Sequence, residues 1–118
     1  MGYLLLFVEP RGLRASRTPA ESRAANDGMR DFAEGLVARG ILVTAQMLSS
    51  DSRATRVQVR DGEVVHAAGP FPDSQQEMIG ALMHIDVATE SEALAIAEQC
   101  PAARWATVEV RPIGALDS

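Results

Sequence analysis

The sequence predicts an α+β fold in which four long strands and two helices follow the order βαββαβ, with a β-hairpin inserted in the middle. Three observations support this prediction. Apolar, β-rich stretches alternate with two helical stretches, each helical stretch opens with a capping-box sequence, and an Asp-Gly pair joins two short strands. Elements in this order pack as two layers, with both helices on one face of an antiparallel sheet. A length of 118 residues fits one domain, which we expect over 1–118.

The first strand is expected over residues 3–8, a run of six apolar side chains that stops before Pro10. Both alternate faces of this run are apolar, which is typical of a strand that is covered on both sides. Two helices cover only one face of a sheet. A second copy of the chain, packed sheet against sheet, is the simplest cover for the other face. The alternative is that the inserted hairpin and the C-terminal tail cover Tyr3, Leu5 and Phe7.

The first helix is expected over residues 19–39. Thr18 and Glu21 have the spacing of a capping box, and Pro19 stands at the first helical position. Apolar side chains then recur at helical spacing until Gly40, namely Ala25, Met29, Phe32 and Leu36.

A second strand is expected over residues 41–48, with Ile41, Val43, Ala45 and Met47 on one face and Leu42 on the other. Asp61-Gly62 is a turn dipeptide suited to positive φ, so residues 55–60 and 63–67 are expected to form a hairpin. The remaining elements are a strand over 78–87, a helix that begins at the capping box 89–92 and halts at Cys100-Pro101, and a last strand over 105–113.

The charge and the single cysteine exclude several classes of function. Eleven basic residues, all of them Arg, against 16 acidic ones leave a net charge of −5, which disfavours binding to nucleic-acid phosphates. The apolar run near the N-terminus is too short for a signal peptide or a membrane span, so we expect a cytoplasmic protein with no membrane partner. One Cys cannot form an internal disulfide or a multi-thiolate metal site, and we expect neither a metal nor another cofactor.

Arg11, Arg14 and Arg17 form a local basic cluster after the first strand. Guanidinium groups at such a site could grip a carboxylate or a phosphate group. The alternative is a solvated, mobile loop.

Five segments resemble the YCII-related domain family, in its DGPF-type branch. They are Ala-Gly-Pro-Phe at 68–71, Glu-Met-Ile-Gly at 77–80, Ile-Asp-Val at 85–87, and Cys-Pro-Ala-Ala-Arg at 100–104 followed by Val-Glu-Val-Arg-Pro at 108–112. The resemblance covers nearly the whole chain. It implies a ferredoxin-like dimeric α+β barrel, hence a homodimer, with a cleft on each protomer that holds a small molecule.

The chain departs from the family pattern at three positions that the resemblance places near this cleft. Ala68 stands where the motif has Asp, Met29 stands where the YciI-like branch has a His that pairs with an Asp, and Ala81 replaces the second Gly of a Gly-Gly pair. Two hypotheses follow. The protein is an enzyme that performs proton-transfer or elimination chemistry near the Gly-Pro-Phe loop, or it is a non-catalytic ligand-binding or regulatory module.

For the enzyme hypothesis, Glu77 and His66 are the candidate proton carriers. Glu77 matches a Glu of the family motif, and Asp73 is the second carboxylate in that region. His66 lies two residues before the Gly-Pro-Phe segment, and an imidazole titrates near neutral pH. The alternatives are a solvated turn carboxylate and a surface histidine.

Candidate ligand-binding residues are Asp73, Phe71, Met29 and His84. Phe71 equally serves as a buried anchor of its loop, beside Gly69 and Pro70. By the period-two rule His84 shares a strand face with Gly80, Leu82 and Asp86, where an interface or core histidine is the alternative. Arg104 and Trp105 could stack on an aromatic ligand, or Trp105 packs the corner before the last strand.

Overall fold

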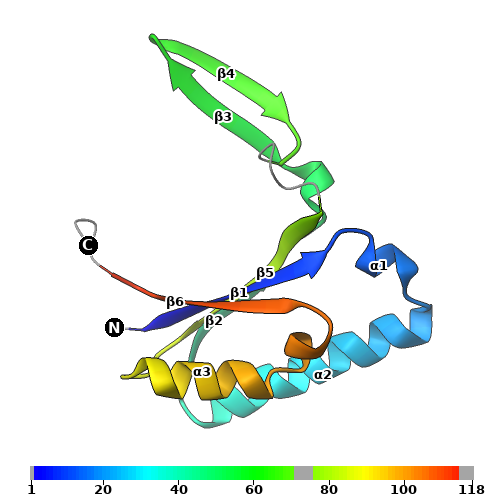
Figure 1. Ribbon diagram of the computed structural model, residues 1–118, viewed down its shortest axis with the longest axis vertical. Coiled ribbons are helices and arrows are strands. Elements are labelled where there is room, and N and C mark those ends of the chain that lie inside the picture. The colour runs from blue at the N-terminus through cyan, green and yellow to red at the C-terminus, as the bar shows by residue number, and fades with distance from the viewer. Residues whose placement is uncertain (1, 71–75, 115–118) are drawn as a thin grey trace.

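An antiparallel four-stranded sheet forms one layer of the protein and the helices form the other (Figure 1). The computed structural model describes residues 2–70 and 76–114. Within these residues the strand order is β2-β5-β1-β6. The strands are β1 (Tyr3–Pro10), β2 (Leu42–Met47), β5 (Glu77–Ile85) and β6 (Thr107–Pro112). The predicted α+β class with an antiparallel sheet is confirmed.

The helices begin where the capping sequences predict. The helical segments are α1 (Leu13–Ser16), α2 (Pro19–Ala38) and α3 (Glu90–Gln99), with 3₁₀ turns η1 (Asp51–Arg53) and η2 (Pro101–Arg104). At α2 the Thr18 hydroxyl accepts from the Glu21 amide at 3.1 Å, and the Glu21 carboxylate accepts from the Thr18 amide at 2.9 Å. At α3 the Thr89 hydroxyl accepts from the Glu92 amide at 3.2 Å. These bonds satisfy backbone donors that a helix start leaves unpaired.

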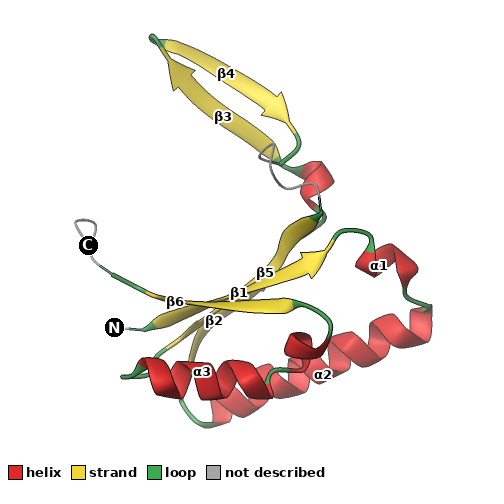
Figure 2. Ribbon diagram, in the orientation of Figure 1, coloured by secondary structure: helices red, strands yellow, loops and turns green. Residues whose placement is uncertain are grey.

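Both long helices lie on the same side of the sheet, and the hydrophobic core fills the space between (Figure 2). Leu5 and Phe7 of β1 are fully buried there. Their buried partners include Met83 and Ile85 of β5, Leu36 of α2 and Ile96 of α3. The helices therefore cover Leu5 and Phe7, and the hairpin does not.

The other side of the sheet carries an apolar strip along its two central strands. Paired residues of an antiparallel ladder lie on the same face, so the register places Leu4, Leu6 and Val8 of β1 beside His84, Leu82 and Ile79 of β5. We call these six residues the outer sheet face. The flanking strands contribute polar side chains at this face, namely Thr44 and Gln46 of β2 and Thr107, Glu109 and Arg111 of β6. No helix in the described part of the chain is long and apolar enough to cross a membrane.

Two irregularities in the ladders change which face some residues occupy. Between Phe7 and Val8 the register with β5 shifts, so that Phe7 pairs with Ala81 and Val8 with Ile79. Gly80 then approaches Glu9 and does not share the face of His84, contrary to the period-two expectation. In β2 a shift between Leu42 and Thr44 places Leu42 on the core side together with Ala45 and Met47, and leaves Val43 56% exposed, so the predicted faces are wrong at these two positions only.

The inserted hairpin projects away from the two layers (Figure 1). It consists of β3 (Thr55–Arg60) and β4 (Glu63–Ala68), as predicted. Asp61 and Gly62 have φ values of 53° and 79°, the left-handed conformation that a two-residue hairpin turn requires. Val57, Val59 and Val64 are exposed on this arm. The hairpin therefore gives no cover to the outer sheet face.

Candidate functional site

A cavity of about 190 Å³ lies between α2 and the sheet, at the end close to α1. One part of its wall is apolar and consists of Phe7, Ala25, Met29, Met47, Ala81 and Trp105. Its polar and charged side chains are Glu9, Arg14, Arg17, Ser22 and Asn26. The main-chain position of Gly80 completes the lining. Residues from both ends of the chain therefore meet at this cavity.

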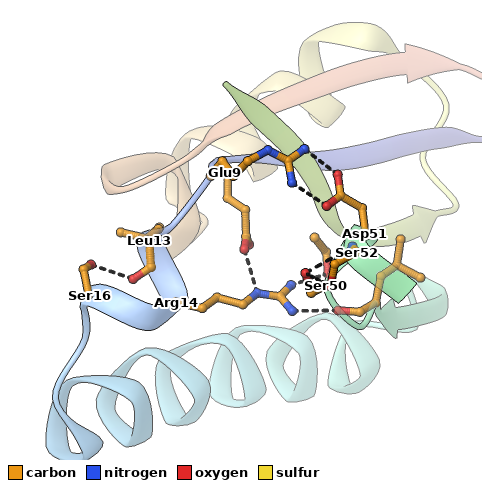
Figure 3. A network of polar contacts seen from close by, with 10 residues as sticks. Glu9, Leu13, Arg14, Ser16, Ser50, Asp51 and Ser52 are labelled. Atoms are coloured by element: carbon orange, nitrogen blue, oxygen red, sulfur yellow. Dashed lines mark hydrogen bonds and ion pairs between the residues drawn. The ribbon is translucent and has the colours of Figure 1, made fainter. Parts of the chain in front are cut away.

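Glu9 and Arg14 form a buried ion pair in the wall of the cavity (Figure 3). Glu9 is only 5% exposed, and its Oε1 accepts a hydrogen bond from Arg14 Nε at 2.6 Å. Arg14 also donates from Nη1 to the Leu48 carbonyl at 2.9 Å and from Nη2 to the Gly80 carbonyl at 3.1 Å. Burying a carboxylate is costly unless a charge of opposite sign compensates it. Arg14 supplies that charge and connects α1 to β1, β5 and the segment after β2.

Gly80 provides the space that the Glu9 carboxylate occupies. A Cβ atom at position 80 would lie 2.2 Å from Glu9 Oε2 and 2.7 Å from Arg14 Nη2. Both distances are well below van der Waals contact. Glycine is therefore required at position 80, because any side chain there would displace the Glu9–Arg14 ion pair.

Arg17 stacks on Trp105 at another part of the cavity. The guanidinium carbon lies 4.4 Å from the centre of the indole ring, within the range of a cation–π interaction. Arg17 is in extended conformation between α1 and α2, and Trp105 follows η2. The residue that lies over the Trp105 ring is Arg17. The sequence had instead suggested the neighbouring Arg104 as the second member of a stacking surface.

Arg11 is not part of the cavity lining and instead pairs with Asp51 of η1. Its Nη2 donates to Asp51 Oδ2 at 2.6 Å, and this bidentate pair joins the turn after β1 to η1. The hydrogen bonds from Arg11 hold the pKa of Asp51 below its ordinary value. The three arginines thus do not act as one cluster. Arg14 and Arg17 line the cavity, and Arg11 connects the turn after β1 to η1. These contacts differ from those of the solvated loop that was the alternative.

The family model of the YCII-related domain matches residues 2–116. The chain belongs to the YCII-related domain family. No curated protein matches the chain.

In this YCII-related chain, Met29 is the one candidate that lines the cavity among Glu77, His66, Met29 and His84, and Arg14, Arg17 and Trp105, also suggested by the sequence as possible ligand contacts, line it too. Glu77 is exposed at the start of β5, opposite Pro10 of β1. His66 is exposed on the projecting arm, opposite Val57, and His84 belongs to the outer sheet face. The structure thus separates Glu77, His66 and His84 from one another. Phe71 and Asp73 lie outside the described residues, and their roles stay predictions.

Cys100 packs in the core of the YCII-related chain, as its position before Pro101 suggested. Its side chain is buried, and its thiol donates to Met29 Sδ at 3.8 Å. Burial raises the pKa of this thiol, which disfavours the reactive thiolate. Among the residues that the structure describes, no group of three or more His, Cys, Asp or Glu side chains is placed to hold a metal ion.

Sequence reasoning missed Glu9, the buried acid of the site. Two signals were available. Glu9 follows Leu5 and Phe7 at a spacing of two, which places a carboxylate on the buried face of β1, and Arg14 comes five residues later. A charged residue in a buried register needs a partner of opposite charge nearby. This rule identifies the Glu9–Arg14 pair without any structure.

Proposed function

We propose that this chain is a homodimeric protein of the DGPF-type branch that binds a small molecule in the cavity beneath α2. The observation that carries the proposal is the buried Glu9–Arg14 pair in the wall of a cavity of about 190 Å³. A few fixed polar groups that converge on an apolar-walled hollow are typical of small-molecule sites.

The size of the cavity limits the ligand. Pockets for drug-sized ligands usually measure about 300–1,000 Å³. The cavity of about 190 Å³ is smaller, with room for about six water molecules at their liquid volume. A compact metabolite with one ring or a short chain fits this space.

The geometry favours binding over catalysis. A general acid or base must be within reach of the proton that it transfers. Neither Glu77 nor His66 belongs to the cavity lining. Glu9 does, but its carboxylate already accepts a hydrogen bond from Arg14 within the wall. The non-catalytic module is therefore the better supported of the two hypotheses, and proton transfer by Glu77 or His66 is the alternative.

The dimer in this proposal is formed through the outer sheet face, with each protomer a ferredoxin-like unit. The strand order β2-β5-β1-β6 with both long helices on one face supports this arrangement. Leu4, Leu6 and Val8 have no helix above them, and Ile79 is 39% exposed. An apolar strip with a polar border is the usual composition of a protein interface.

A fragment screen by thermal shift tests the binding site, because a ligand at one hundred times its Kd adds about 2.7 kcal/mol of stability. Ala25→Phe fills the cavity from α2, and Ala24→Phe places the same ring on the exposed side of the helix. We expect fragments that raise the Tm of the wild type and of Ala24→Phe but not that of Ala25→Phe. Equal shifts in both variants, or no active fragment, would contradict the proposal.

A further inference from the structure

The charged side chains that line the cavity do not cancel. Glu9 and Arg14 neutralise each other, and Arg17 adds one positive charge. Glu21, an acid whose charge interacts with that of Arg17, is exposed and engaged in the capping box of α2. A chain with a net charge of −5 thus has a cavity whose described lining is positive. This charge favours an anionic ligand.

Trp105 holds the Arg17 guanidinium in a defined orientation. The guanidinium carbon lies over the indole ring, 4.4 Å from the ring centre. The N–H bonds of a guanidinium lie in its plane, so stacking on an aromatic ring leaves them available for in-plane acceptors. A carboxylate matches this edge with two parallel hydrogen bonds. The anionic group that fits Arg17 best is therefore a carboxylate.

Glu9 offers a hydrogen-bond acceptor at another point of the same wall. An ionised carboxylate has about four acceptor sites, and Arg14 Nε occupies one of them on Oε1. A ligand hydroxyl that donates to Glu9 would compensate this buried charge further.

The wall between these two charges suits a flat apolar body. Trp105 presents an aromatic ring and Met29 and Met47 present flexible thioethers, whereas Phe7 lies behind this surface and is only 1% exposed. Sulfur atoms of Met side chains make favourable contacts with aromatic ring edges. A planar ring therefore fills this space better than a sugar or a polar chain.

We infer that the ligand is a small planar hydroxy acid, with its carboxylate on Arg17, its hydroxyl on Glu9 and its ring against Met29 and Met47. This inference rests on the proposed function, because it names the chemistry of the ligand for the same cavity.

Trp105 fluorescence provides the assay, since it is the single Trp of the chain and lines the cavity. The probes are 4-hydroxybenzoate, benzoate, which lacks the hydroxyl, and phenol, which lacks the carboxylate. For the wild type we expect 4-hydroxybenzoate to bind about tenfold more tightly than either of the others, the usual scale for one hydrogen bond to a charged group. This comparison requires no variant.

Arg17→Met tests the carboxylate contact, and Arg23→Met on the exposed surface of α2 is the control with the same change of charge. We expect Arg17→Met to weaken 4-hydroxybenzoate and benzoate about tenfold and to leave phenol unchanged. Arg23→Met should leave all three affinities unchanged.

The outcomes separate the two proposals. If phenol binds as tightly as 4-hydroxybenzoate, or if Arg23→Met weakens the acids as much as Arg17→Met, the inference on the ligand is wrong and the binding cavity stands. If none of the three probes binds but other fragments do, and Ala25→Phe abolishes the binding of those fragments, the inference on the ligand is again wrong and the binding cavity stands. If no fragment binds at all, both proposals fail.

Discussion

The Glu9 carboxylate occupies the space that a side chain at position 80 would need. A larger residue in place of Gly80 would therefore clash with Glu9. Glu9 is a buried charge whose position depends on Arg14 and on the missing side chain at position 80. The bulge in the β1–β5 ladder brings the two residues together. The ion pair is therefore a property of this local packing as well as of its two charges.

Gly80→Ala should destabilise the protein by about 1–3 kcal/mol, because the added Cβ overpacks the site and pushes the Glu9 carboxylate away from Arg14. Gly35→Ala is the matched control. A Cβ at position 35 meets nothing within 4 Å, and Ala in a helix interior is preferred over Gly by about 0.5–1 kcal/mol. Urea denaturation should therefore give changes of opposite sign. A Gly80→Ala protein as stable as the wild type would show that the contact is relieved at no cost.

The turn after β1 and the turn before the hairpin are joined at the level of elements. Arg11 pairs with Asp51 of η1, and the Arg11 amide donates to the Gln76 carbonyl at 2.8 Å. These contacts hold the base of the projecting arm against the end of β1. The arm beyond them is a two-stranded hairpin, which has little stability by itself in water.

The Arg11–Asp51 pair should make stability depend on pH in the acid range. The pKa of Asp51 is lowered in the folded protein from an ordinary value of 3.8, mainly by the hydrogen bond from Arg11. The stabilisation is thus fully present above pH 3.8 and is lost as the pH falls through the lower folded value. Urea denaturation from pH 6 downwards should show wild type more stable than Asp51→Asn, with a difference that shrinks in acid.

Asp31→Asn controls for the loss of one negative charge in that experiment, because Asp31 is exposed on α2 and outside these contacts. It should not reproduce the stability loss of Asp51→Asn near neutral pH. A difference between wild type and Asp51→Asn that stays constant down to the lowest pH would contradict the role of this pair.

The whole molecule has one covered and one uncovered sheet face. Helices bury the Leu5 and Phe7 side, while no helix in the described part of the chain covers Leu4, Leu6 and Leu82 of the outer sheet face. Apolar strips of this kind on a soluble protein usually mark an interface.

Sedimentation should give twice the protomer mass of 12.6 kDa at micromolar concentration. Leu6→Asp places a charge at the centre of the outer sheet face and should shift the protein to 12.6 kDa. Val37→Asp adds the same charge at a 61% exposed position on α2 and should stay dimeric. A wild type that sediments as a single protomer would refute the proposed dimer.

Local structure was predictable from the sequence because its determinants lie within a few residues of one another. The Thr18–Glu21 capping box spans four residues, and the Asp61-Gly62 turn needs only left-handed backbone at two positions. The apolar character of both faces of β1 is a property of six consecutive side chains. The order of strands and helices, the hairpin and the need for cover on a second sheet face all follow from such short-range patterns.

The site required the tertiary structure, because its contacts join residues far apart in the chain. Arg14 reaches the Gly80 carbonyl across 66 positions, and Arg17 meets Trp105 only where the end of η2 returns to α2. A one-residue register shift turned Gly80 toward Glu9, and period-two counting has no means of placing such a bulge. Side-chain type and spacing determined the elements, whereas the packing of one element on another decided which charges face the cavity.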